Sequence, residues 1–169
     1  GRVASPLAEN KSLTRQKEYT RNLNKEDGLK EIDLAYVAGI IDGEGCIGLY
    51  SNTHKYLNKH REIRPRYCLT VTVCNTNEEL IKWFHSLFGG HLHYRKSKEE
   101  KWKPQWECKL SANKALDFLK LIYPYLRLKK PQAEIAFRFQ ERQQGHRLTD
   151  QELIIAASEK VLMANLNKR

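Results

Sequence analysis

Apolar and polar residues along this chain follow two different periods, and the changes between them predict the elements of the fold. Four segments alternate with a period of two, as half-buried strands do. These strands are expected at residues 46–50, 66–73, 91–95 and 105–110. Apolar residues recur at helical spacing in the remaining segments, at 34–42, 80–88, 112–123, 131–145 and from 149 onward. The predicted order is a helix, two strands, a helix, two strands and further helices.

Capping signals mark the ends of several of these helices. Asp33 is expected to cap the first helix, and residues 75–79 provide a cap and an acidic first turn for the second. Gly89 and Gly90 end that second helix. Thr149 and Glu152 have the spacing of a capping box, which predicts the start of the last helix. The apolar residues of that helix are Leu153, Ile154, Ala157, Val161 and Leu162.

Each predicted strand has one apolar and one polar face, which favours an α+β fold whose sheet has one side packed on the core. The apolar set, including Leu69, Val71, Leu92 and Trp106, is expected in the core. A polar sheet face can enter the major groove of DNA and distinguish base pairs, whereas the alternative is an ordinary sheet facing water. The polar-face residues are Cys46, Gly48, Tyr50, Asn52, Arg66, Cys68, Thr70, Thr72, His93, Arg95, Gln105, Glu107 and Lys109.

The charge of the chain favours a polyanionic partner. Its 30 Lys and Arg against 20 Asp and Glu give a formal net charge of +10, although a basic protein without such a partner is the alternative. The 169 residues are 40% hydrophobic, enough for one domain with its own core, expected at 32–169. Residues 1–31 lack an apolar period and form an N-terminal extension, either a solvated arm or an arm that contacts DNA.

The cysteines and the hydropathy of the chain indicate an intracellular protein. Cys46, Cys68, Cys74 and Cys108 form no Cys-x-x-Cys pair, so we expect reduced thiols rather than a zinc site or disulfides. The sequence contains neither an apolar run of the roughly 20 residues that a membrane span needs nor a secretory signal. The expected compartment is the cytoplasm of a prokaryote or an organelle.

One stretch, residues 34–45, carries the most specific signal. Ala35, Ala38, Gly39 and Asp42 recur at helical spacing and leave one face of the first helix almost without side chains. Such a face lets another helix approach closely. The stretch ends in Asp-Gly-Glu-Gly, where Glu44 can project from the helix end beside the carbonyl of Gly43. These oxygens suit a hard cation such as Mg²⁺, and two solvated acids at a helix stop are the alternative.

Residues 37–45, Val-Ala-Gly-Ile-Ile-Asp-Gly-Glu-Gly, closely resemble the signature of the LAGLIDADG homing endonucleases. The order of predicted elements over residues 34–140 also matches that family, and the resemblance implies an α+β fold with a curved antiparallel sheet that forms a saddle across DNA and is backed by helices. The resemblance implies that Glu44 binds metal with help from the Gly43 carbonyl. It further implies that Asn75 orders the attacking water and that Lys129, after Pro124-x-Leu126-x-Leu128, supports charge at the active site. Glu44 stands where aspartate is commoner, which lengthens the arm by one methylene.

The single copy of the signature implies a homodimer paired through the face formed by Ala35, Ala38, Gly39 and Asp42. The expected activity is Mg²⁺-dependent cleavage of both strands of a long pseudo-palindromic DNA site, leaving short 3′ overhangs, in the setting of a mobile intron or intein. Mn²⁺ is the expected substitute, and Ca²⁺ is expected to bind without supporting cleavage. The rival is a non-catalytic RNA maturase or DNA-binding regulator. Joint retention of Gly43, Glu44 and Lys129 favours the nuclease.

Overall fold

The computed structural model describes residues 29–52, 65–97, 101–143 and 147–168. Its elements follow the order predicted from the sequence. They are α2 (Glu31–Glu44), β1 (Gly45–Asn52), β2 (Arg66–Asn75), α3 (Glu78–Phe88), β3 (His91–Arg95), β4 (Gln105–Ser111), α4 (Ala112–Ile122), the 3-10 turn η1 (Tyr123–Tyr125), α5 (Lys130–Arg142) and α6 (Asp150–Leu166). The N-terminal extension predicted at 1–31 falls largely outside the described residues, as does most of the basic connection between β1 and β2. Leu29 is already buried in the core, so the packed domain begins before residue 32.

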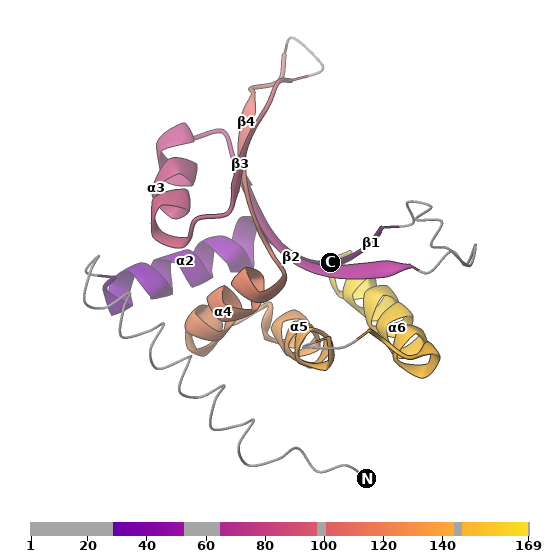
Figure 1. Cartoon of the computed structure of the whole chain (residues 1–169). Coiled ribbons are helices and arrows are strands. Elements are labelled where there is room, and N and C mark those ends of the chain that lie inside the picture. Colours follow the sequence, from indigo (N-terminus) through magenta and orange to yellow (C-terminus); the bar gives the residue numbers. More distant parts are fainter. Residues whose placement is uncertain (1–28, 53–64, 98–100, 144–146, 169) are drawn as a thin grey trace.

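The four strands form one curved antiparallel sheet in the order β1-β2-β4-β3. Helices α2, α4, α5 and α6 cover one side of the sheet, and α3 packs beside β3 and β4 (Figure 1). The opposite, concave side carries no other element of the described chain, and we call it the open face (Figure 1). The expected α+β architecture is therefore confirmed.

Strand register places the apolar alternation on the helix side. Leu69 and Val71 are buried, while Leu92 and Trp106 are half-buried and pack against the same core. Residues paired across a sheet point to the same side. The pairs Cys46–Thr72, Gly48–Thr70, Thr72–Lys109 and His93–Glu107 therefore connect the polar set across all four strands. All thirteen polar-face positions lie on the open face, as the alternation predicts.

The sidedness of β2 makes a direct prediction about stability. Leu69 is completely buried, whereas its neighbour Cys68 is half-exposed on the open face. Leu69→Ala should lower the free energy of unfolding by about 2–5 kcal/mol, because the lost side chain leaves a cavity in a packed core. Cys68→Ala, the matched control, should change it by about 0.5 kcal/mol or less. Urea unfolding measures both, and a larger cost at Cys68 would mean that the face assignment is wrong by one residue.

The start of α2 differs from the sequence-based expectation, whereas the cap and acidic first turn expected for α3 within residues 75–79 are present. Asp33 is the third residue of the helix rather than its cap, and its carboxylate accepts from the Lys30 backbone N–H at 3.3 Å. Asn77 caps α3 by accepting from the Leu80 backbone N–H at 3.0 Å. Asn75 instead ends β2, which is two residues longer than predicted. Pairing with β4 extends that strand, and a period-two pattern does not reveal such pairing.

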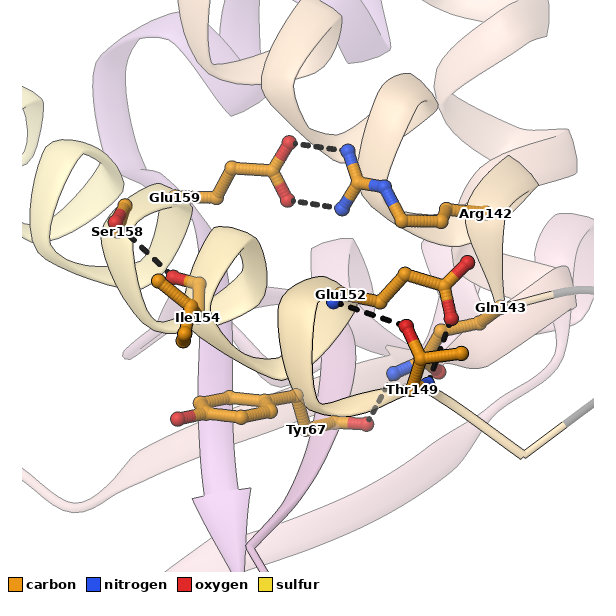
Figure 2. Close-up of polar contacts among 8 residues, drawn as sticks. All are labelled: Tyr67, Arg142, Gln143, Thr149, Glu152, Ile154, Ser158 and Glu159. Carbon is orange, nitrogen blue, oxygen red and sulfur yellow. Dashed lines mark hydrogen bonds and ion pairs between the residues drawn. The ribbon is translucent and has the colours of Figure 1, made fainter. Parts of the chain in front are cut away.

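Helix α6 is held by polar contacts as much as by apolar ones. Arg142 on α5 donates two hydrogen bonds to the Glu159 carboxylate, each 2.8 Å long (Figure 2). The predicted capping box is present, with Thr149 and Glu152 bonded reciprocally (Figure 2). Ala156, Glu159 and Met163 are the buried residues of α6, whereas Ile154, Ile155, Val161 and Leu162 are exposed. The apolar residues expected on this helix are thus mostly not its buried ones, and Glu159, paired with Arg142, lies among the buried set instead.

None of the described helices has the length and apolar composition that a membrane crossing requires.

Candidate active site and nucleic-acid interface

The candidate active site lies at the junction of α2 and β1. Glu44 is the last residue of the helix and its side chain is exposed, while Gly45 begins the strand. A Cβ atom at Gly45 would lie 2.7 Å from the Ile41 Cα. Real Cβ atoms do not approach backbone that closely, so this tight change of direction requires glycine. The junction therefore projects the Glu44 carboxylate at the start of the sheet.

Asn75 lies beside this carboxylate because β2 ends where β1 begins. Its Nδ2 donates to Glu44 Oε2 at 2.6 Å, and its Oδ1 accepts from the Asn77 backbone N–H at 2.8 Å. The second bond fixes the amide orientation, since an oxygen must face a donor. Its N–H₂ group is thereby directed at Glu44. The structure brings together these two residues, which lie 31 positions apart in the chain.

Lys129 reaches the same end of α2 from the segment before α5. Its Nζ donates to the carbonyl oxygens of Ile41 at 2.7 Å and Asp42 at 2.8 Å. A cation bonded to the last carbonyls of a helix complements the negative end of its dipole. Partial burial lowers the pKa of Lys129, and the nearby Asp42 charge opposes that shift. Lys129, although distant in sequence, therefore caps the end of the helix whose last residue is Glu44.

Asp42 has a role that the sequence did not reveal. Its carboxylate accepts from the backbone N–H groups of Arg127 at 2.7 Å and Lys129 at 3.0 Å. These bonds hold the segment before α5 against the helix end. Asp42, which we expected on the dimer-pairing face, therefore positions Lys129 within its own chain.

The face of α2 that was predicted to pair with a second copy is only partly accessible in this chain. Ala35 and Gly39 are exposed, and a Cβ built at Gly39 meets no atom within 4 Å. Ala38 is a correction, because it is completely buried in the core of its own chain and is inaccessible to a second molecule. The sequence also missed Ile32 and Tyr36, which are 72% and 55% exposed on the same helix. Their exposure indicates that an apolar surface of α2 remains uncovered in one copy of the chain.

The donor set at Glu44 fits a divalent ion that is shared with other ligands. The described residues contain no group of three or more His, Cys, Asp or Glu side chains that could hold a metal by themselves. Mg²⁺ is commonly bound through one or two carboxylates, with waters and substrate phosphates completing the shell. Gly43 is exposed, with open space where a Cβ would stand. One carboxylate beside an accessible backbone thus fits such a site, completed by ligands from outside this chain.

The open face is strongly polar, but its residues are not equally accessible. Tyr50, Arg66, His93, Arg95 and Gln105 are exposed, whereas Thr70 and Glu107 are only 2% and 5% exposed. Lys109 Nζ lies 5.4 Å from the centre of the Tyr50 ring, in a cation–π contact. The register adds Cys74, His91 and Ser111 to this face. Cys74 was missed because β2 was expected to end before it.

Comparisons with solved structures identify the fold. No family model matches the sequence, and no curated protein matches it. The homing endonuclease I-CvuI in complex with its target superposes with a TM-score of 0.65 at 21% identity, covering 80% of this chain and 82% of that one. The archaeal intron-encoded homing endonuclease I-Vdi141I, complexed with DNA, gives a TM-score of 0.65 at 14% identity, covering 80% and 84%.

Two further homing endonucleases differ in length. I-TnaI superposes with a TM-score of 0.59 at 16% identity, and the match covers 83% of this chain and 95% of that one. The LAGLIDADG homing endonuclease I-GzeII, in complex with its DNA target, superposes with a TM-score of 0.55 at 16% identity. The match covers 77% of this chain but only 43% of that one. The chain therefore has the LAGLIDADG homing endonuclease fold, which confirms the expectation from residues 37–45 and the order of elements.

Proposed function

We propose that this chain is a site-specific DNA endonuclease that cuts both strands of a long pseudo-palindromic target by metal-assisted phosphodiester hydrolysis. The observation that carries the proposal is the hydrogen bond between Asn75 and Glu44 at one end of the polar open face, at a helix end that Lys129 caps. If the end of α2 had only a structural role, it would not need an exposed carboxylate next to a surface that could bind phosphate groups. The net charge of +10 supports a polyanionic substrate.

Divalent ions, when bound, would activate water and offset the charge of the phosphate in the transition state. Glu44 and the Gly43 carbonyl would hold them. Asn75 keeps the Glu44 carboxylate in one orientation through its 2.6 Å hydrogen bond, and it is the candidate for ordering the attacking water. Lys129 stabilises the helix end that bears both ligands. The ion proposed is Mg²⁺, and I-CvuI was solved in the presence of Mg and of Ca.

Each copy of the chain offers one Glu44, so cutting two strands is best served by two copies. We propose a homodimer that pairs through the exposed part of α2, with Ala35 and Gly39 at the contact and Ile32 and Tyr36 beside it. The pairing would bring two Glu44 carboxylates together. The length of I-GzeII supports this proposal. This chain covers only 43% of I-GzeII, which therefore has room for two units of this size.

On the open face, exposed side chains of all four strands would enter the major groove, where hydrogen-bonding groups distinguish base pairs. Arg66, Arg95 and Gln105 are suited to base edges, and lysines to phosphates. The rival function, an RNA maturase or a DNA-binding regulator, would use this face without needing Glu44. Four free cysteines among the described residues are compatible with a reducing compartment.

The test is incubation of the purified protein with a library of randomised duplex DNA, with and without Mg²⁺, followed by sequencing of the cleaved ends. The proposal expects Mg²⁺-dependent double-strand breaks at one family of related sites. Selective binding without cleavage would favour a regulator, and preferential binding of structured RNA would favour a maturase.

Lys129→Met should lower the single-turnover cleavage rate more strongly than it weakens DNA binding. The substitution removes a charge that is wanted mainly in the transition state, so we expect a rate loss on the order of 10²-fold. It also removes two hydrogen bonds to the α2 carbonyls, which should cost about 1 kcal/mol of stability. Rates at saturating protein, gel-shift affinities and urea unfolding separate these effects. An unchanged rate with weaker binding would make Lys129 a phosphate anchor instead.

A further inference from the structure

A nearly covered carboxylate lies in the middle of the open face. Glu107 belongs to β4, and its register partners are Cys74 on β2 and His93 on β3. Its side chain is only 6% exposed, although the sheet is open on this side. A buried carboxylate that is not paired is costly, so its neighbours must account for its charge.

Two donors from the flanking strands converge on a single oxygen of Glu107. Arg95 Nη2 forms an ion pair with Oε2, and the Cys74 Sγ donates to the same atom at 3.3 Å. Burial, together with the hydrogen bond to Glu107, raises the pKa of the Cys74 thiol to about 11. The thiol therefore stays protonated near neutral pH and remains a donor. Cys74 holds Glu107 from one side while Arg95 covers it from the other.

Arg95 differs from its partner in being exposed. Its side chain is 61% exposed, against 6% for Glu107, so the guanidinium lies above the carboxylate and is accessible from the open face. An acid that contacts a base must be accessible from the groove, whereas the Glu107 side chain is almost completely buried and its Oε2 is already bound by Arg95 and Cys74. An arginine that contacts guanine needs a defined orientation, because both hydrogen bonds of the bidentate contact must form together.

We propose that Glu107 is a positioning residue that holds Arg95 in the orientation for contacting a guanine in the major groove. The inference rests on the proposed function and deepens it, since it assigns the specificity of one base pair in each half-site to a pair of residues. Glu107 itself contacts no base. Its effect on specificity passes entirely through Arg95, and the hydrogen bond from Cys74 on the neighbouring strand fixes the carboxylate.

A double-mutant cycle tests this dependence. Wild type, Glu107→Gln, Arg95→Ala and the double variant are each used to select bound duplexes from a randomised library in Ca²⁺, so that binding is measured without cleavage. Glu107→Gln should reduce the preference for guanine at one position of each half-site about tenfold. In the Arg95→Ala background the same Glu107→Gln substitution should change the base preference at no position. The effects of two coupled residues are not additive, and Glu107 acts only through Arg95. Glu141→Gln, which removes an equal charge from α5, serves as the control.

A measurement without DNA examines the orientation of Arg95 directly. In the free protein the Arg95 Nε–H should be ordered by ¹⁵N NMR relaxation, and it should become mobile in Glu107→Gln while the melting temperature of the fold is retained. A preference change caused by Glu107→Gln in the Arg95→Ala background would show that Glu107 contacts a base and would overturn the inference alone. An Arg95 that stays ordered in Glu107→Gln would also overturn it. A wild-type protein without any sequence preference would overturn the proposed function and the inference together.

Discussion

Glu44→Gln should abolish cleavage, a loss on the order of 10³-fold or more, while specific DNA binding is retained or slightly tightened. The variant loses the carboxylate charge that would hold a divalent ion, and it also loses the repulsion between that charge and the phosphate. The local structure should survive, because the glutamine oxygen can still accept the hydrogen bond from Asn75 Nδ2. The helix end, which is held by Lys129 and Asp42, is not altered.

Single-turnover cleavage in Mg²⁺ and gel-shift affinity in EDTA measure the two effects separately. Glu134→Gln is the matched control, because Glu134 is an exposed acid on α5 outside the site. This variant should cleave DNA at the wild-type rate. Robust cleavage by Glu44→Gln would refute the mechanism and not only one of its details. A simultaneous loss of binding would indicate that Glu44 is needed for the structure instead.

If the chain pairs through α2 as proposed, Gly39→Leu should yield a folded monomer that no longer cuts both strands. Within one copy the new side chain has room, because a Cβ at Gly39 meets no atom within 4 Å. Leucine also favours a helix over glycine by about 0.8–1 kcal/mol, so the thermal stability of the protomer should not fall. Between two closely approaching helices, however, the added side chain has no space. The structure thus predicts loss of assembly without loss of folding.

Analytical ultracentrifugation and circular dichroism measure assembly and folding separately. Ala164→Leu adds a leucine to an exposed position of α6 and should remain a dimer, which controls for added surface hydrophobicity. A Gly39→Leu protein that remains dimeric would place the pairing surface elsewhere. A wild-type monomer that cuts both strands would refute pairing through α2 altogether.

The pattern of the sequence determined the order of elements and the sidedness of every strand. Both depend on local periodicity, because a strand that is buried on one face must alternate, and a slip by one residue would expose its whole apolar set. The register therefore confirmed which thirteen residues share the open face. The Asp-Gly-Glu-Gly sequence likewise predicted that the first helix ends at Glu44. The physical reason is that only glycine fits at position 45, because a Cβ atom there would collide with Ile41.

Tertiary structure alone decided which side chains are accessible and what they contact. Ala38 and Gly39 are both small residues of the same predicted helix face, but Ala38 is completely buried in the core of its own chain. Asp42 contacts backbone 85 and 87 residues away, which no local spacing encodes. Glu107 and Arg95 lie on one face in sequence terms, but packing covers the first and exposes the second. On α6, Glu159 lies buried in an ion pair with Arg142 on α5, while Ile154 and Ile155 are exposed, and the local apolar pattern does not encode this arrangement.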